Sequence, residues 1–485
     1  MLALITSFLL SVFIPTLLRR NFLHISFGIV MPIAIIAQLA FIIYNGNYES
    51  FSFPYAVPIT FSLTPIYAYF CIFICILWGI ANVYTALYIT HNYGERKLTI
   101  FMPFYNLSVC AALLMTISGD LITTFIFYEL LTIATLPLVG FAKNDESRKS
   151  IVKYTFILSF TALALFLPAI LILQHTVGTT TFSTGGTISL LFTQELSSPN
   201  LHNYSYMPSP AIMMLILVML IFGVAKSAIF PFNGWLPAAM CAPAPVSALL
   251  HAVAVVKSGA FVTYKIIYEL YGIQYFQYLK EQYGYIFIII TLIAVIGIIV
   301  ASVQAIFAKN IKKILAFSTI SHMTYIFLLF FAGTTITMQA GFWHIAVHGF
   351  TKIALFFIAG ILYSVYHTNN YTKMSGAFNQ NKILTFALCI CVFSLMGMPF
   401  TSGFMSKQLT VNALTDAQAF IALFGIVFSS LATAIYLGKP LIYLNSKAKQ
   451  RIMPNALKYA GYFVILPVSL INLVGFGFVF IKHSH

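Results

Sequence analysis

The chain has 485 residues, 60% hydrophobic and 7% charged, with a mean hydropathy of +0.95 and a formal net charge of +15. Soluble domains carry about a quarter charged residues, so this composition excludes a soluble fold. No polar stretch is long enough to form a separate soluble domain. We therefore predict an all-α polytopic membrane protein in which residues 1–485 form a single membrane domain.

Apolar runs long enough to cross a hydrocarbon core of about 30 Å recur from one end of the chain to the other. The first run ends in Arg19-Arg20 and no small-residue cleavage site follows it, so we expect a retained helix and not a signal peptide. The sequence predicts about fourteen helices, at residues 3–18, 25–44, 62–90, 100–118, 120–142, 151–174, 210–230, 244–270, 284–308, 313–331, 339–366, 382–412, 418–440 and 458–481.

The placement of the basic residues explains the net charge. If the N-terminus lies outside, eighteen of the 25 Lys and Arg fall in loops on the cytoplasmic side, and Lys265, Lys280 and Lys482 fall on the opposite side. This asymmetry is the positive-inside distribution of membrane proteins. The basicity therefore requires no nucleic-acid partner. The distribution of the basic residues instead predicts that the chain lies in a lipid bilayer.

Several charged residues fall inside the predicted helices, where each costs at least about 2.5–3.5 kcal/mol on insertion scales. Lys226 precedes Pro231, which breaks its helix, and a broken helix beside a buried lysine is a common ion-site design in transporters. Lys257 lies close to mid-membrane. Glu129, in the middle of the fifth helix, must stay neutral or find a cation, for which Lys226 is the candidate. The alternatives are a snorkelling Lys226 and a permanently neutral Glu129.

The eleventh predicted helix carries three titratable groups on one face. His344, His348 and Lys352 are spaced four residues apart, which places them about 6 Å apart per step along the helix. Such a row is typical of a proton relay, and no acidic residue flanks it to complete a metal site. His251 and His322 are isolated, so each could be a satisfied polar group as well as part of the path.

The twelfth predicted helix is interrupted by Gly397, Pro399 and Gly403, and Lys407 follows. Membrane helices tolerate such residues where neighbours or water satisfy the freed backbone groups. We therefore expect a hydrated pocket at this break. The alternative is a packing kink with a snorkelling lysine.

Neither the six cysteines of the chain nor the glycines of its longest loop predict cofactor chemistry. The six cysteines lie almost entirely in apolar runs without paired spacings, which favours small core residues and no metal. The loop glycines match no phosphate-binding pattern, so we expect a flexible surface loop. The cysteines are Cys71, Cys75, Cys110, Cys241, Cys389 and Cys391, and the glycines are Gly178, Gly185 and Gly186.

Together these segments resemble the proton-translocating antiporter-like subunits of Mrp-type cation/proton antiporters, respiratory complex I and membrane-bound hydrogenases. The stretches that carry the resemblance cover roughly residues 100–410. They are FYELLTIATLPLVGF, KSAIFPFNGWLPAAMCAPAPVSALLHAVAVVKSGAF, KKILAFSTISHMTYI, HIAVHGFTKIALFFIAG and GMPFTSGFMSK.

The resemblance implies two inverted five-helix repeats with broken helices 7 and 12. Residues 1–99 would hold helices 1–3, residues 100–270 the first repeat, residues 284–440 the second repeat, and residues 458–481 helix 14. It also implies a role for each charged residue. Glu129 and Lys226 would modulate the entry half, Lys257 would be the central proton carrier, His322, His344 and His348 would connect the halves, and Lys407 would be the exit-side carrier.

Within this family the sequence is most similar to the D-type subunit of Mrp antiporters, because it keeps His251 before Lys257 and has Lys, not Glu, at position 407. The sequence ends soon after the last predicted helix, so we expect neither a lateral helix nor a further C-terminal domain. Departures are Thr64-Pro65 where many relatives have Asp-Pro, and Lys265 where Arg is common.

We expect a proton-translocating subunit of a multisubunit monovalent cation/proton antiporter in a bacterial inner membrane, with other membrane subunits as partners. The sequence contains no flavin, nicotinamide or iron–sulfur signature, so we expect no cofactor and no redox site in this chain. The alternatives are a proton-pumping membrane-arm subunit of a complex I-like oxidoreductase or membrane-bound hydrogenase, and a scaffold that has kept the fold without transport.

Overall fold

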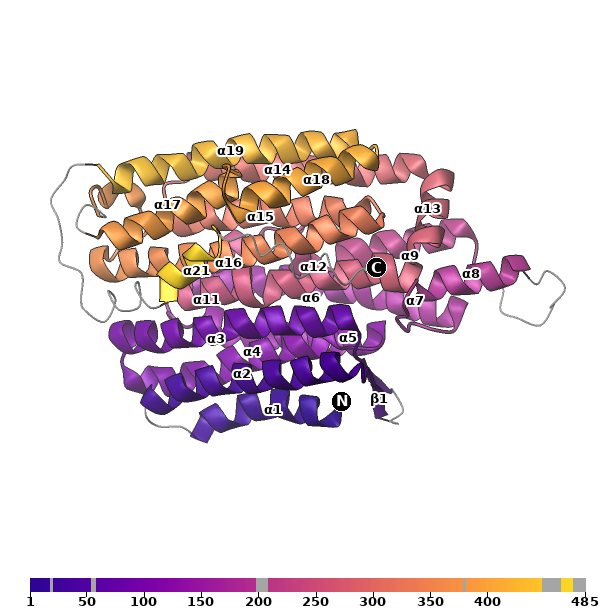
Figure 1. Cartoon of the computed structure of the whole chain (residues 1–485), viewed down its shortest axis with the longest axis horizontal. Coiled ribbons are helices and arrows are strands. Elements are labelled where there is room, and N and C mark those ends of the chain that lie inside the picture. The colour runs from indigo at the N-terminus through magenta and orange to yellow at the C-terminus, as the bar shows by residue number, and fades with distance from the viewer. Residues whose placement is uncertain (18–20, 54–57, 198–207, 378–380, 447–463, 474–485) are drawn as a thin grey trace.

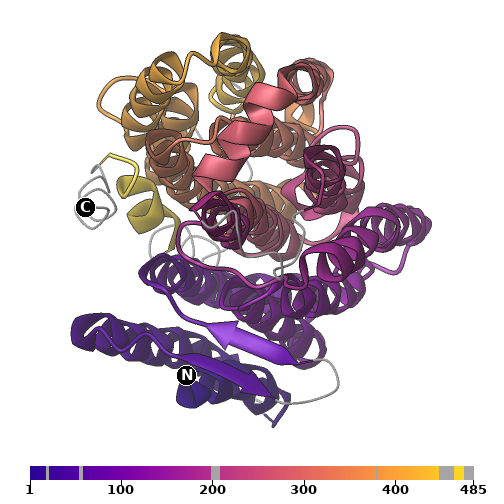
Figure 2. The ribbon, with the colours of Figure 1, turned by 90° about the vertical axis from the view of Figure 1, so that its right-hand side faces the viewer.

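The computed structural model describes the chain except for residues 18–20, 54–57, 198–207, 378–380, 447–463 and 474–485. Its helices lie side by side along the long axis of the molecule (Figure 1), and an end-on view shows them as one bundle (Figure 2). Ten of the described helices are long and apolar enough to cross a membrane. The prediction of a polytopic helical membrane protein is therefore confirmed.

The N-terminal part contains one feature that the sequence did not predict, a two-stranded antiparallel hairpin. The third predicted helix began at residue 62, but its true start is Pro65, where Thr64 accepts a hydrogen bond from the amide of Tyr67 and proline fits the first helical position. The elements are α1 (Leu2–Leu17), α2 (Asn21–Asn45), β1 (Ser50–Phe53), β2 (Ile59–Ser62) and α3 (Pro65–Tyr93).

The predicted helices 4–6 are present, and polar caps mark the starts of the fifth and the sixth. Asp120 accepts from the amide of Thr123, and Asn144 forms a capping box with Ser147. The sixth helix contains a π-helical turn, η1. The elements are α4 (Glu95–Thr116), α5 (Leu121–Val139), α6 (Asp145–Thr161), η1 (Ala162–Phe166) and α7 (Leu167–Val177).

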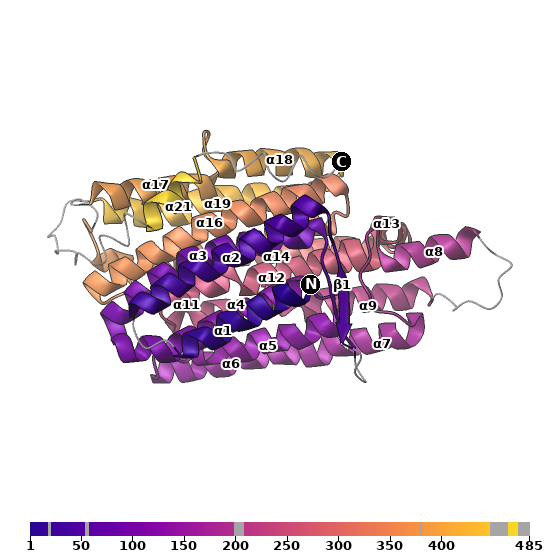
Figure 3. The ribbon, with the colours of Figure 1, turned by 60° about the horizontal axis from the view of Figure 1, so that its bottom comes forward.

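The long loop after α7 holds a helix where we expected only a flexible surface loop, so that expectation was wrong for residues 187–197. This helix, α8 (Thr187–Ser197), extends past the bundle at the end that carries β1 and the N-terminus (Figure 3). The chain enters it through Gly186, whose φ is +92° and where an added Cβ would lie 2.1 Å from the Cα of Gly272. Close backbone contact of two glycines thus anchors the start of α8.

The seventh helix ends earlier than predicted. Helix α9 (Pro210–Gly223) stops eight residues before Pro231, and Lys226 lies in a short 3₁₀ turn, η2 (Ala225–Ser227). The end of α9 packs closely on η1, because an added Cβ on Gly223 would lie 2.7 Å from the backbone nitrogen of Phe166. The break therefore surrounds Lys226. Regular structure resumes in α10 (Trp235–Ala238) and η3 (Ala239–Cys241).

The eighth helix is interrupted by two π-helical segments. It comprises α11 (Ala244–Ala248), η4 (Leu249–Val253), α12 (Val255–Tyr264) and η5 (Lys265–Tyr271). Such segments are frequent at functional sites in helices. His251 lies in η4 and Lys257 in the first turn of α12. Lys265, which the charge distribution places on the outer side, lies in η5 and is fully buried.

The second half of the chain contains the predicted helices 9–13. Helix 12 is broken between its halves at residues 397–401, as predicted, whereas Gly403 belongs to the first turn of the second half. Helix 14 (458–481) falls largely outside the described residues, which include only α21 (Leu466–Leu470). The other elements are α13 (Ile273–Gln282), α14 (Gly284–Phe307), α15 (Ile311–Phe331), α16 (Thr335–Tyr366), η6 (Tyr371–Lys373), α17 (Lys382–Met396), α18 (Ser402–Asp416) and α19 (Phe420–Leu444).

Candidate functional site

Helices α12 and α16 bring the central lysine against a histidine. The Nζ atom of Lys257 lies 2.6 Å from Nδ1 of His348 and 3.8 Å from the sulfur of Met323. Both Lys257 and His348 are fully buried. At this distance the two nitrogens share one proton, so one partner donates and the other accepts. The sequence predicted both residues but not their contact.

A pair of histidines continues the row from this point across α15 and α16. Nδ1 of His322 lies 2.9 Å from Nε2 of His344, and the two buried rings are nearly parallel. The ring centroid of His322 lies 5.3 Å from that of His348. Nε2 of His322 and Nε2 of His348 are buried and have no hydrogen-bond partner among the described residues. Buried polar groups are rarely left unpaired, so these two nitrogens mark the point at which the residues alone do not complete the row.

The histidine row reaches broken helix 12 through a serine that the sequence analysis missed. Nδ1 of His344 lies 2.8 Å from Oγ of Ser406, the residue before Lys407. The ring of Tyr325 stacks on His344 at 4.1 Å, and its hydroxyl donates to Thr410 at 2.6 Å. The adjacency of Ser406 to Lys407 was the only available signal, and it does not indicate which way the hydroxyl points.

Lys407 lies at the break itself. Its ammonium donates to the carbonyl oxygens of Leu395 and Met396, at 2.8 and 2.9 Å. These two residues end α17, so their carbonyls lack intrahelical partners, and a cation at a helix C-terminus is stabilised by the helix dipole. The prediction of a lysine site at this break is consistent with this arrangement.

Two further predicted residues lie beside this row but do not join it by direct hydrogen bonds. Lys352 is fully buried and donates to the carbonyl of Leu315 at 3.0 Å. His251 is also buried, its ring lies 4.7 Å from that of Phe356, and neither of its nitrogens has a partner among the described residues. Both remain candidates for proton transfer.

In the first half, Lys226 is held by α5. Its Nζ donates to the carbonyl of Tyr128 at 2.8 Å and to the hydroxyl of Thr132 at 2.6 Å, and it lies 3.1 Å from the centroid of the Tyr128 ring. The lysine therefore makes three contacts with two residues of α5 and is fully buried. Lys226 therefore does not extend its ammonium to the membrane interface, as a snorkelling lysine would.

The expected ion pair between Glu129 and Lys226 is not formed. Among the described residues, the one salt bridge within 4.0 Å joins the N-terminal amine to Glu49. Oε1 of Glu129 is buried without a hydrogen-bond partner, while the residue as a whole is half-buried. Its neighbours one turn away on α5, Ile126 and Ile133, are 37% and 60% exposed. Tyr128 faces the interior and contacts Lys226. The next residue, Glu129, lies on the face of α5 that is at the outside of this chain.

The structure also buries a polar cluster that the sequence analysis did not identify. Glu269 accepts from the hydroxyls of Tyr67 and Tyr264, and Lys265 donates to the carbonyl oxygens of Thr116 and Ser118. These residues join α3, α4 and the end of helix 8. The i, i+4 spacing of Lys265 and Glu269 was a readable signal, although burial could not be read from it.

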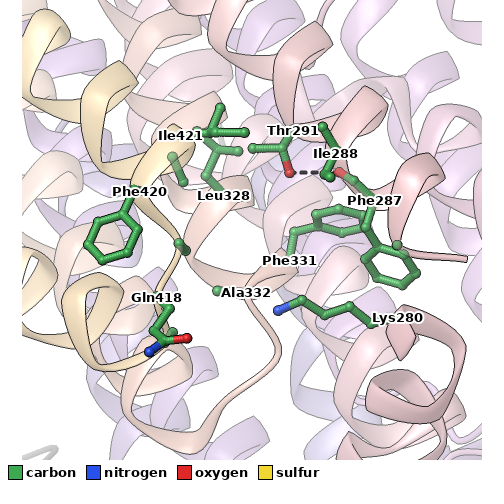
Figure 4. A pocket seen from close by; sticks show the side chains of 14 residues that line it. Lys280, Phe287, Ile288, Thr291, Leu328, Phe331, Ala332, Gln418, Phe420 and Ile421 are labelled. Carbon is green, nitrogen blue, oxygen red and sulfur yellow. Dashed lines mark hydrogen bonds between the residues drawn. The ribbon is translucent and has the colours of Figure 1, made fainter. Parts of the chain in front are cut away.

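A separate cavity of about 270 Å³ lies at the end of the bundle near α13. Its walls are mainly apolar, and the side chain of Lys280 reaches across it toward Gln418 (Figure 4). Partial burial lowers the pKa of Lys280 below its ordinary value. None of the histidines and lysines of the buried row lines this cavity.

The sequence of this chain matches a known protein family. A family model described as "NADH:quinone oxidoreductase/Mrp antiporter, TM" matches residues 118–433. This range contains every charged or histidine residue predicted for the site.

Curated relatives are larger proteins. The putative antiporter subunit mnhA2 of Staphylococcus haemolyticus is 28% identical over 411 residues, which cover 81% of this chain and 48% of that protein. NADH-quinone oxidoreductase subunit L of Rickettsia conorii is 27% identical over 391 residues, covering 80% and 55%. The chain therefore spans about half the length of these relatives.

Solved structures match nearly the whole chain. A chain of the membrane-bound sulfane sulfur reductase, an archaeal respiratory membrane complex, aligns with a TM-score of 0.80 and 21% identity over 96% of this chain and 93% of its own. A chain of the Mrp complex from Dietzia sp. aligns with a TM-score of 0.75 and 20% identity over 98% and 49%. At these identities the match establishes the shared fold.

Proposed function

We propose that this chain, which belongs to the NADH:quinone oxidoreductase/Mrp antiporter transmembrane family, moves protons as one subunit of a multisubunit monovalent cation/proton antiporter. It is a multi-pass membrane protein and an antiporter-like subunit of the Mrp or complex I type. A position like that of the D-type Mrp subunit, in a bacterial inner membrane, is part of the proposal. It rests on His251 before Lys257 and on lysine at position 407.

One observation carries the proposal: a buried row of titratable groups links the two halves of the chain. Lys257 contacts His348, and His322 contacts His344, which reaches Ser406 beside Lys407. Polar groups this deep in an apolar protein are costly, and they are typical of ion and proton pathways. A row that only stabilised packing would not need unpaired imidazole nitrogens.

Each step along the row requires only proton transfer between neighbouring groups, directly or through water. A neutral imidazole donates from one nitrogen and accepts on the other, so His348 can take a proton from Lys257 at Nδ1 and release one from Nε2. The unpaired Nε2 atoms of His348 and His322 belong to a step of the row that lacks a direct hydrogen bond, and the step from Ser406 to Lys407 lacks one as well, since the ammonium of Lys407 donates to carbonyls of α17. Beyond the first of these steps, the contact between His322 and His344 leads toward helix 12.

The test is proton movement in membrane vesicles that contain the complete complex, with the amount of this subunit checked by immunoblot. Lys257→Gln should abolish cation-dependent proton movement at normal subunit level, because Gln keeps length and polarity but does not titrate. Lys257→Arg should also fail, since Arg does not release its proton. Near-normal proton movement with Lys257→Gln would overturn the proposal and favour a scaffold without transport.

The second candidate is a proton-pumping membrane-arm subunit of a complex I-like oxidoreductase or hydrogenase. It is supported by the similarity to a subunit L and by the fold match to a chain of a respiratory reductase complex. Affinity purification of the intact complex and identification of its subunits separates the two. Copurified flavin or iron–sulfur subunits favour the oxidoreductase, and a set composed only of membrane subunits favours the antiporter.

A further inference from the structure

Asn472, which follows α21, connects three helical elements around the break in helix 12. It is 1% exposed. Its side-chain oxygen Oδ1 lies 2.7 Å from the hydroxyl of Thr351 on α16, 3.2 Å from that of Ser394 on α17 and 3.3 Å from that of Ser402 on α18. All three neighbours are buried hydroxyls, and that of Thr351 also lies 2.7 Å from the carbonyl oxygen of Val347. One acceptor on the last described segment is therefore shared by both halves of helix 12 and by helix 11.

The main chain of Asn472 adds a contact to the same junction. Its carbonyl oxygen accepts from the backbone N–H of Ser402 at 2.8 Å. Ser402 is the first residue of α18, where backbone N–H groups have no partner within the helix. Asn472 therefore satisfies one of the donors that the break exposes.

The geometry of Lys407 depends on this junction. Lys407 belongs to α18, but the acceptors of its ammonium, the carbonyls of Leu395 and Met396, belong to α17. The two halves meet closely, because an added Cβ on Gly403 would lie 1.7 Å from the carbonyl oxygen of Ser394. A change in the spacing of α17 and α18 would therefore move the lysine relative to its acceptors.

We propose that Asn472 is a positioning residue for Lys407, holding the two halves of helix 12 at the spacing that places the ammonium on the end of α17. The inference rests on the proposed function of Lys407 as a proton carrier. The inference also connects the segment after α19 to the proposed proton path a second time, because Asn472 contacts Thr351, the residue before Lys352 on α16.

The test compares two replacements of Asn472 in the complete complex. Asn472→Asp keeps an acceptor for the three hydroxyls, whereas Asn472→Leu keeps the shape and removes the acceptor. We expect Asn472→Leu to lower the rate of proton movement about 10-fold or more at normal subunit level, and Asn472→Asp to retain most of it. Ser469→Ala, in the same segment, is the matched control and should leave the rate unchanged. Equal losses for Leu and Asp would overturn the proposal.

A double variant separates positioning of Lys407 from general stability. Lys407→Glu cannot donate from a carboxylate to the carbonyls of α17, so Asn472→Leu should cause little further loss in that background. An equal loss in both backgrounds would contradict positioning. If Lys407→Gln transports protons normally, the proposed function of Lys407 fails.

A cross-link tests the packing without measuring transport. The hydroxyl of Ser469 lies 3.3 Å from the sulfur of the native Cys391 on α17. Ser469→Cys should therefore form a disulfide with Cys391 when an oxidant is added, detected as a cross-link between fragments after cleavage between them. Adding Asn472→Leu should lower its yield. If the cross-link does not form while Asn472 is intact, the proposal for Asn472 is overturned. If the cross-link forms but Lys407→Gln does not lower proton movement, only the proposed function of Lys407 is overturned.

Discussion

Nζ of Lys257 and Nδ1 of His348 lie 2.6 Å apart, and neither residue is exposed. If this contact passes protons, His348→Ala should lower proton movement in vesicles at least about 100-fold, the lower end of the usual contribution of a positioned acid or base. His348→Gln should fail equally, because its amide does not titrate. Met323→Leu removes the other neighbour of the ammonium and conserves volume, so it should remain near normal. Normal transport with His348→Gln would contradict a direct proton transfer here.

The hydroxyl of Ser406 should matter for transport more than for assembly. Ser406→Ala leaves Nδ1 of His344 without its partner at 2.8 Å, and loss of one hydrogen bond corresponds to about a 10-fold lower rate. Ser406→Thr keeps the hydroxyl and should restore most of the rate. The measurement is the initial rate of proton movement at equal subunit level. A threonine variant as impaired as the alanine variant would point to packing, and not to the hydroxyl.

Replacing Gly403 even by alanine should destabilise the protein. The Cβ of alanine would lie 1.7 Å from the carbonyl oxygen of Ser394, so the two halves of helix 12 must separate. Overpacking of this kind costs about 1–3 kcal/mol. We expect Gly403→Ala to lower the midpoint of thermal unfolding of the purified complex and to lower transport. Gly438→Ala is the control, because nothing lies within 4 Å of its added Cβ.

Periodicity and hydropathy predicted most of the fold, because a membrane helix satisfies its own backbone and must be apolar over a fixed length. The same periodicity placed His344, His348 and Lys352 on one face of α16. It could not predict that Lys257 meets His348, since the packing of α12 against α16 determines that contact. The hairpin before α3 was missed because four-residue strands give almost no periodic signal.

The position of each helix break was harder to predict than its existence. Proline marked the seventh helix as broken, but the helix ends at Gly223, where contact with the π-helical turn of the sixth helix requires a missing Cβ. Lys265 was counted with the basic residues on the outer side, yet it is buried against backbone carbonyls. Burial of a charge depends on tertiary acceptors that no local pattern encodes.

The positive-inside distribution predicts that Arg148, near the start of α6, and Lys309, just before α15, face the cytoplasm and that Asn47, before β1, faces outside. All three residues are exposed in this chain. Cysteine substituted at Asn47 should react with an impermeant thiol reagent in sealed cells, and cysteine at Arg148 or Lys309 should react only after permeabilisation. Labelling of position 309 in sealed cells would reverse the topology.

Glu129 should lie against a neighbouring subunit. It is half-buried with a buried, unpaired Oε1, and it shares its face of α5 with Ile126 and Ile133, which are exposed in this chain. Since Oε1 is itself buried within the chain, the surface open to a neighbouring subunit is the apolar one that Ile126 and Ile133 form beside it, in contrast to the surroundings of Lys226, which is fully buried. Cysteine at Ile133 should therefore react with a lipid-soluble maleimide when this subunit is expressed alone and be protected in the complete complex. Cysteine at Phe156, which is 65% exposed on α6, is the comparison site. Equal labelling of position 133 in both preparations would mean that lipid, and not a partner subunit, covers Glu129. Glu129→Gln should then leave the subunit composition of the purified complex unchanged.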